Sequence, residues 1–230
     1  MAALPDVSSV AALMADPTRA AMLSALLDGR SRAAGELAAC AGVSAQAASN
    51  HLSRLLLGGL LLREAHGRQR SYRLRGEEVA HALEALAALQ PSPAPRVAPS
   101  GVPQALRFAR TCYDHLAGVL GVAVTEALVA TGRLLPEGQS YRTSAKGEAW
   151  LGQLGVRVAD LQRTRRPFAR GCLDWSERRS HLAGALGAAL LTRWLDEGWL
   201  VRLPQGRAVR LTLKGRRGLE TELRLHVPTA

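Results

Sequence analysis

The sequence predicts a mainly α-helical protein with small β-hairpins, an α+β fold made of two domains. Several segments repeat apolar residues at spacings of three and four, which is typical of amphipathic helices. Strand-like runs that turn at a glycine follow helical segments at residues 60–75 and again at 199–215. Between these halves, residues 90–103 contain five prolines, and proline cannot continue a helix or an inner strand because it fixes φ and lacks an amide donor.

The proline-rich segment sets the expected domain boundaries. We expect an N-terminal domain at residues 1–90, an extended linker at 91–103 and a C-terminal domain at 104–230. Up to residue 90 the chain has nine arginines and eight acidic residues, whereas the remainder has 21 basic and 11 acidic residues. The basic excess therefore lies in the C-terminal half, where it favours phosphate contact or an anionic ligand, with a solvated surface as the alternative.

The N-terminal domain contains two predicted helices joined by a glycine turn. The first helix covers residues 32–41, and Gly42 lies in the turn. Ser44 can cap the second helix, because its hydroxyl can accept a hydrogen bond from a free amide of the first turn. Leu52 and Leu55 lie on one side of that helix, and a short polar face lies on the other. The polar face consists of Gln46, Ser49, Asn50, Ser53 and Arg54. Such groups suit base edges and phosphates in a DNA major groove, so the pair predicts a helix-turn-helix.

A basic hairpin follows the polar helix. Its first strand is apolar, its second strand alternates, and its turn falls at His66-Gly67-Arg68. A hairpin in this position is the wing of a winged helix-turn-helix domain, which would reach phosphates or the adjacent minor groove. The expected wing contacts are Arg63, Arg68 and Arg70.

Residues 11–89 resemble an ArsR-type winged-helix transcriptional repressor of bacteria. The family's usual opening is matched by ALMADPTRAAMLSALLDG at 12–29, and its recognition-helix pattern by VSAQAASNHLSRLLLGGLL at 43–61. The resemblance implies a homodimer that binds double-stranded DNA at an inverted-repeat operator and is released by an effector. It also implies DNA contacts by Ser44, Gln46, Ser49, Asn50, His51 and Arg54.

The two metal sites common in that family are not supported by this sequence. The site on the helix before the recognition helix is reduced to Cys40, and a lone thiol among alanines is more often a small buried side chain. The last helix of the domain, at 76–89, offers His81 without a second histidine cluster. Apolar stripes without an obvious partner occur on this helix and on the first one, which favours a two-fold dimer.

The C-terminal domain repeats the order of helices followed by a basic hairpin. We expect a long helix or two at 104–132, a short strand and a helix at 141–156, and an amphipathic helix at 176–198 that begins at Ser176. The hairpin at 199–215 follows. This order predicts a second winged-helix-like domain, without a clear recognition helix of its own.

Two segments of the C-terminal domain share the order Cys, Asp, His-Leu-Ala-Gly. They are CYDHLAG at 112–118 and GCLDWSERRSHLAG at 171–184, and the spacing in the first predicts a Cys and a His on one helical face. Thiolate, imidazole and carboxylate groups can bind zinc or a similar divalent ion. The same groups can form a thiol-based redox sensor, or they can be ordinary packed side chains. An anionic small-molecule effector, bound by Arg178 or Arg179, is the competing interpretation of the same pocket. The candidate effector or metal residues are Cys112, His115, Cys172, Asp174 and His181.

Several classes of protein find no support in the sequence. It has no P-loop, no strand-associated GxGxxG, no GxSxG and no HExxH, so we do not expect an enzyme. No uncharged apolar run reaches about 18 residues, so we expect no membrane-spanning helix. The sequence shows no export signal and its three cysteines are widely separated, so we expect the protein in the cytoplasm. The alternative to a regulator is a tandem winged-helix replication initiator or chromosome-scaffold protein that senses no ligand. An effector-dependent change in operator affinity distinguishes the two.

Overall fold

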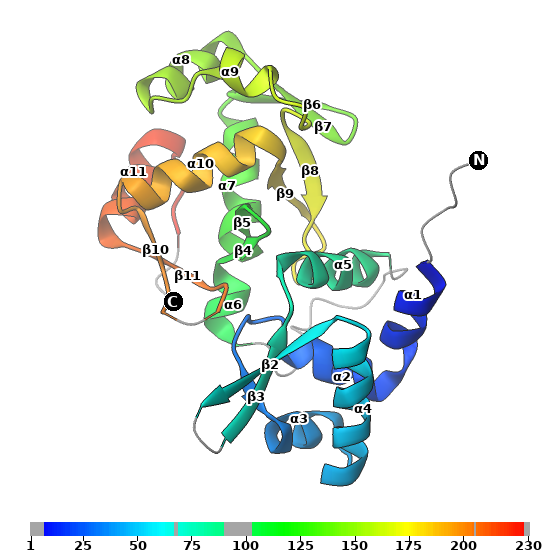
Figure 1. The fold of residues 1–230 in the computed structure, drawn as a ribbon. Helices are drawn as coiled ribbons and strands as arrows, with labels where there is room; N and C mark the ends of the chain where they lie inside the picture. The colour runs from blue at the N-terminus through cyan, green and yellow to red at the C-terminus, as the bar shows by residue number, and fades with distance from the viewer. Residues whose placement is uncertain (1–6, 67–68, 90–102, 205, 228–230) are drawn as a thin grey trace, which may run out of the picture. The chain divides into compact units, whose positions relative to one another are not determined.

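The computed structural model describes residues 7–66, 69–89, 103–204 and 206–227 (Figure 1). The chain forms two compact units, Met1–Leu83 and Glu84–Ala230, so the division falls inside helix α5 (Glu77–Ala88). Of the predicted linker at 91–103, only Pro103 lies among the described residues. Each unit has its own apolar core. No helix among the described residues is long and apolar enough to cross a membrane.

The N-terminal unit is a winged helix-turn-helix domain, as predicted. The turn between its two central helices begins at Gly42, which has φ +65°, and Ser44 caps the second helix. Arg32 and Ala33, expected to begin the first helix, instead form a short strand that pairs with Tyr72 and Ser71 of the wing. The three strands have the order β1-β3-β2. The elements are α1 (Val7–Ala15), α2 (Pro17–Ala25), β1 (Arg32–Ala33), α3 (Ala34–Ala41), α4 (Ala45–Leu57), β2 (Leu61–His66), β3 (Gln69–Leu74) and α5.

The C-terminal unit consists of two copies of one arrangement, a hairpin, a helix, a second hairpin and a second helix. The first repeat contains β4 (Arg110–Cys112), β5 (His115–Ala117), α7 (Gly118–Ala130), β6 (Leu134–Glu137), β7 (Ser140–Thr143) and α8 (Ala145–Gln153). The second repeat contains β8 (Arg170–Leu173), β9 (Ser180–Ala183), α10 (Gly184–Asp196), β10 (Leu200–Arg202), β11 (Val209–Leu211) and α11 (Leu213–Leu223). The short helices α6 (Gln104–Phe108) and α9 (Val158–Gln162) precede the two repeats.

The long helix of each repeat begins at an equivalent glycine, Gly118 in α7 and Gly184 in α10. Gly118 and Gly184 have φ values of +81° and +84°, which side-chain-bearing residues rarely adopt. A Cβ at Gly118 would lie 2.5 Å from the carbonyl oxygen of Arg107, and one at Gly184 would lie 2.6 Å from that of Pro167. The tight turn from hairpin to helix therefore requires glycine in both repeats.

Strands of each repeat pair with strands of the other, and the two repeats share one apolar core. The second hairpin of each repeat pairs with the first hairpin of the other, through Ser140 and Arg170 in the sheet β6-β7-β8-β9 and through an isolated bridge between Arg110 and Ala208. Helix α7 packs against β9, and α10 packs against β5 (Figure 1). Neither repeat is therefore a separate domain.

Two elements of the C-terminal half differ from the prediction. The expected helix at 104–132 is interrupted by the hairpin β4–β5, and the helix expected to begin at Ser176 begins at Gly184, after β9. The residues of β4 and β5 are all buried, so they show no alternation that would distinguish a strand from a buried helix. The helix capped by Ser144 and the hairpin of β10 and β11 are as predicted, and helices with small antiparallel sheets are confirmed as the fold class.

Candidate nucleic-acid interface and metal centre

Helix α4 presents the predicted polar face to solvent. Its apolar side is fixed in the N-terminal core by Ala48, Leu52 and Leu55, which are at most 1% exposed. The hydroxyl of Ser44 accepts a hydrogen bond of 3.3 Å from the amide of Ala47 and so orders the first turn. The exposed polar side chains are Ser44, Gln46, Ser49, Asn50, Ser53 and Arg54. This surface carries hydrogen-bonding groups and one cation and no carboxylate.

His51 lies at the edge of this face and is half-buried. Its Nδ1 is 3.6 Å from Oδ1 of Asp16, the residue that caps α2. The pKa of Asp16 is lowered by the hydrogen bond from the backbone N–H of Arg19 and, against some desolvation, by the charges of Arg19 and His51. His51 therefore connects α4 to the start of α2 and does not extend outward with the exposed polar side chains.

The wing carries two of its three predicted contacts on one face. Arg63 pairs with Tyr72 across the hairpin and Ala65 pairs with Arg70, so both arginines share that face and both are exposed. Arg68 lies outside the described residues. Cys40, expected to be buried, is exposed on α3, because its position on that helix faces away from the core residues Leu37 and Ala38.

Four of the five predicted effector residues come together inside the C-terminal unit. One ligand-type atom from each of Cys112, His115, Cys172 and His181 lies within 4.8 Å of every other. Cys112 pairs with His115 across β4 and β5, and Cys172 pairs with His181 across β8 and β9. The expectation that Cys112 and His115 share a helical face is wrong, because they lie opposite each other on two strands.

Both imidazoles point the same ring atom into the cluster. The Nε2 atoms of His115 and His181 are 3.1 Å apart. The other ring nitrogen of each faces a carboxylate: Nδ1 of His115 is 3.5 Å from Oδ1 of Asp114, and Nδ1 of His181 is 3.2 Å from Oδ2 of Asp174. Each repeat therefore supplies one thiol, one imidazole and one carboxylate behind the imidazole.

Asp174 supports the cluster from behind and does not belong to the group of four. Its side chain is fully buried and accepts hydrogen bonds from the backbone N–H of Gly118 at 2.7 Å and from Arg110 at 2.9 Å. Burial raises the pKa of Asp174, but the close contact with His181 and the charge of Arg110 outweigh it and hold that pKa far below its usual range. The same contact raises the pKa of His181 against the effect of its burial.

The two thiols ionise differently. The hydrogen bond with Cys172, then burial and the charge of Glu84, raise the pKa of Cys112. The hydrogen bond with Cys112 lowers the pKa of Cys172 against burial, with further help from His115 and His181. Without a cation, the cluster therefore favours one thiolate over two.

A buried ionic network adjoins Cys112. The Cys112 thiol donates to Oε2 of Glu84 at 3.3 Å, and Arg207 and Trp175 donate to Oε1 at 2.9 and 2.8 Å. Burial alone would raise the pKa of Glu84, but the charges of Arg207 and Arg110 lower it overall. The roles of Glu84, Arg110 and Arg207 could not be predicted from the sequence, because ion pairs between distant segments leave no local pattern.

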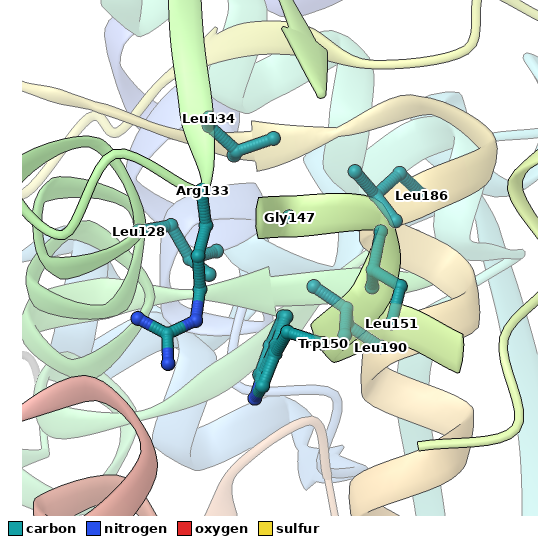
Figure 2. Close-up of a pocket in the computed structure, with 8 residues that line it drawn as sticks. All are labelled: Leu128, Arg133, Leu134, Gly147, Trp150, Leu151, Leu186 and Leu190. Atoms are coloured by element: carbon teal, nitrogen blue, oxygen red, sulfur yellow. The ribbon is translucent and has the colours of Figure 1, made fainter. Parts of the chain in front are cut away.

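Other parts of the C-terminal unit offer less to a ligand. The pocket in Figure 2 lies in the apolar core, with Arg133 over the ring of Trp150 at 5.3 Å. Arg178 and Arg179, considered for an anionic effector, donate to the carbonyl of Ala87 and to Glu126. The pocket is lined by Leu128, Arg133, Leu134, Gly147, Trp150, Leu151, Leu186 and Leu190.

Comparison with known proteins places the whole chain in one family. A helix-turn-helix domain model matches residues 14–64. The uncharacterized HTH-type transcriptional regulator YdfF of Bacillus subtilis is 42% identical over 224 residues, which cover 97% of this chain and 99% of that protein. The chain belongs to the helix-turn-helix transcriptional regulators. The predicted recognition of a winged-helix regulator with a C-terminal extension is thereby confirmed.

Two further relatives match only about a third of the chain. The HTH-type transcriptional regulator CmtR of Mycobacterium tuberculosis is 46% identical over 70 residues, 30% of this chain and 58% of that protein. Its solved structure, described as a cadmium metal-sensor, is 38% identical and covers 39% of this chain and 99% of that one, with a TM-score of 0.32. The homodimeric winged helix-turn-helix domain of Mb0332 from Mycobacterium bovis, a possible ArsR-family regulator, is 30% identical. The match covers 37% of this chain and 86% of that domain, with a TM-score of 0.33.

Proposed function

We propose that this transcriptional regulator is an effector-released repressor of the ArsR type, which binds an inverted-repeat operator as a homodimer in the cytoplasm. The observation that carries the DNA-binding part is the exposed face of α4, where amide, hydroxyl and guanidinium groups stand together without a carboxylate. Asn and Gln can bind adenine through two hydrogen bonds, and Arg can bind guanine in the same way. Asn50 and Arg54 are therefore the proposed base-reading residues.

The wing supplies contacts of a different kind. Arg63 and Arg70 share one exposed face of the hairpin, and guanidinium groups there would bind phosphates, which position the protein without reading sequence. Replacing Arg70 by Ala should therefore weaken binding to all duplexes alike and reduce the salt dependence by about one released ion.

Exposed apolar side chains support the proposed dimer. Val7 and Val10 of α1 are 68% and 39% exposed, and Leu86 and Leu89, at the end of α5 and just after it, are 50% and 78% exposed. A two-fold interface would bury such residues and would place two recognition helices about one DNA turn apart. The Mb0332 domain, which is described as homodimeric, provides a precedent among the relatives.

The proposal is tested by selecting duplexes from a random-sequence pool with the full chain. The selected sequences should contain an inverted repeat with half-sites about 10 base pairs apart. Asn50→Ala and Arg54→Ala should each cost about 1–3 kcal/mol in operator binding and relax the base preference at one position per half-site. Arg157→Ala is the matched control, because Arg157 is an exposed arginine whose side chain contacts Asp160.

The proposal fails in two ways that are easily recognised. Selected duplexes without any shared repeat, or unchanged operator affinity in both α4 variants, would remove α4 as the reading helix. Sedimentation that shows a monomer at micromolar concentration would remove the dimer. Repression and release are measured separately, with a reporter gene behind the selected operator.

A further inference from the structure

We propose that Cys112, His115, Cys172 and His181 bind one divalent zinc-like ion, Zn²⁺ or Cd²⁺, in a closed four-coordinate site. The donor set of two thiolates and two imidazoles is one that such borderline-to-soft ions prefer. The proposal names the effector class of the proposed repressor, and it rests on the proposed function only for its effect on DNA binding.

The distances suit an ion of this kind. Bonds of about 2.0–2.3 Å in a tetrahedron hold the ligand atoms about 3.3–3.8 Å from one another. The two Nε2 atoms are 3.1 Å apart, and all four ligand atoms lie within 4.8 Å of each other. Shifts of about 1 Å or less in side-chain position complete the tetrahedron.

The repeated architecture builds the site from equivalent pieces. Each repeat places a Cys and a His opposite each other on its first hairpin. Each repeat also makes room for the histidine of the other repeat: a Cβ at Gly187 would lie 3.2 Å from the Cβ of His115, and one at Gly121 would lie 3.5 Å from the Cβ of His181. The hairpins and the two glycines therefore bring both histidines to one point.

The carboxylates around the cluster are already paired with arginines, so two thiolates in the cluster would need a divalent cation to balance their charge. Glu84 and Asp174 carry two negative charges, which Arg110 and Arg207 balance at 2.9 Å. Asp114 is balanced by Arg166 through two hydrogen bonds. Two thiolates among these neutral pairs would be an uncompensated buried charge, and a divalent cation compensates both.

The support behind the ligands is typical of a metal site. Metal-binding imidazoles usually direct their second nitrogen to a carboxylate, which fixes the ring and its tautomer. His115 faces Asp114 in this way and His181 faces Asp174. Four protein ligands leave no open position, so the site would hold the ion for structure or sensing and not for catalysis.

Helix α5 provides a connection to the DNA-binding unit. It begins in the N-terminal unit, and its Glu84 accepts a hydrogen bond from the Cys112 thiol. A metal-bound thiolate has no proton to donate, so loading with the ion ends this bond. An ion that binds one arrangement of α5 better than another shifts the equilibrium between them.

The test begins with metal binding by the full chain in the absence of DNA. Reduced, metal-free protein is titrated with Cd²⁺ while the near-ultraviolet absorption of the cadmium–thiolate bonds is followed. The wild type and Cys40→Ser should saturate at one Cd²⁺ per chain, because Cys40 is exposed on α3. Cys112→Ser and Cys172→Ser should each bind more weakly by more than about 100-fold, beyond the usual effect of outer-shell changes.

A second measurement uses the wild type alone, in case a variant does not fold. Alkylation followed by mass spectrometry should show that one equivalent of Zn²⁺ protects Cys112 and Cys172 and leaves Cys40 reactive. Reaction of all three cysteines in the presence of Zn²⁺ overturns the proposal. A Cys112–Cys172 disulfide that forms on mild oxidation, in protein that takes up no metal, overturns it as well and favours a redox sensor.

Regulation is then measured with the selected operator duplex by fluorescence anisotropy. One equivalent of Zn²⁺ should weaken operator binding of the wild type by about 5–150-fold, the usual range of allosteric coupling, and should leave Cys172→Ser unchanged. Metal uptake without this change supports the site and contradicts release by metal. Failure to bind any duplex contradicts the proposed function, while the cadmium titration still decides the site.

Discussion

The first repeat of the C-terminal unit joins its ligand strands by the two-residue turn 113–114, whereas the second repeat joins them by the six-residue loop 174–179. The ligands are the same in both, a Cys and a His in direct register. The supporting carboxylates differ. Asp114 is 32% exposed and pairs with Arg166 near the surface, whereas the side chain of Asp174 has no exposed area.

The longer loop explains this difference. It lets Asp174 accept hydrogen bonds from the backbone N–H of Ser176 at 2.9 Å and from that of Gly118, in the other repeat, at 2.7 Å. It also brings Trp175 over the guanidinium of Arg110 at 4.9 Å. The two repeats therefore contribute equally to the ligands and unequally to the structure that holds them.

The largest expected effect separates the two carboxylates. Asp174→Ala should lower the free energy of unfolding of the C-terminal unit by about 3–5 kcal/mol, because Arg110 then stays buried without this partner. Asp114→Ala should cost about 0–1 kcal/mol, as is usual for pairs near the surface. All four tryptophans lie in this unit, so their fluorescence during urea unfolding reports on it alone. Equal losses of unfolding free energy in Asp174→Ala and Asp114→Ala would contradict the unequal structural roles of the two carboxylates.

A smaller effect tests whether the repeats pack equivalently. Gly187→Ala should cost about 1–3 kcal/mol, the usual range for an overfilled core. The added Cβ would meet the carbonyl oxygen of Leu182 at 2.5 Å and His115 at 3.2 Å. Gly121→Ala should cost a similar amount, since its Cβ would meet the oxygen of Leu116 at 2.5 Å. Gly152 has open space around it, so Gly152→Ala is the control and should stabilise α8 by about 0.5–1 kcal/mol. A lower free energy of unfolding in only one of these two glycine variants would mean that the two repeats do not pack equivalently.

The smallest expected effect concerns metal affinity. Asp174→Asn should weaken Zn²⁺ binding by about 10–100-fold, because the carboxylate that orients His181 is lost. Asp114→Asn should weaken it less, since Asp114 is partly exposed and water can replace its contact of 3.5 Å with His115. Competition with a chromophoric chelator measures both affinities. The reverse order of the two losses would contradict the assignment of Asp174 as the main support.

The N-terminal unit could be predicted from the sequence because its signals are local. Ser44 before an amphipathic run and glycine after it define α4, and burial of one side exposes the other. The convergence of Cys112, His115, Cys172 and His181 could be anticipated from the shared order of residues in two segments. The strands that carry them could not, since three-residue strands with every side chain buried have no alternation.

The internal repeat had a usable signal that extends beyond the cysteines. Phe-Ala-Arg leads into the first hairpin of each repeat, at 108–110 and at 168–170, and its Arg is the first residue of the first strand. Both segments lead to a His-Leu-Ala-Gly that begins a helix, so alignment of the chain with itself would have placed the two hairpins. The pairing of Arg110 with Asp174 depends on how the repeats exchange their strands, which no single segment encodes.

The central claim is that the two repeats share one ion, with one Cys and one His from each. X-ray absorption at the zinc edge, measured on the full chain loaded with one equivalent of Zn²⁺, tests it most directly. The site predicts two sulfur ligands at about 2.3 Å and two nitrogen ligands at about 2.0–2.1 Å. A shell of nitrogen and oxygen alone, or a single sulfur, would contradict a site built from both repeats.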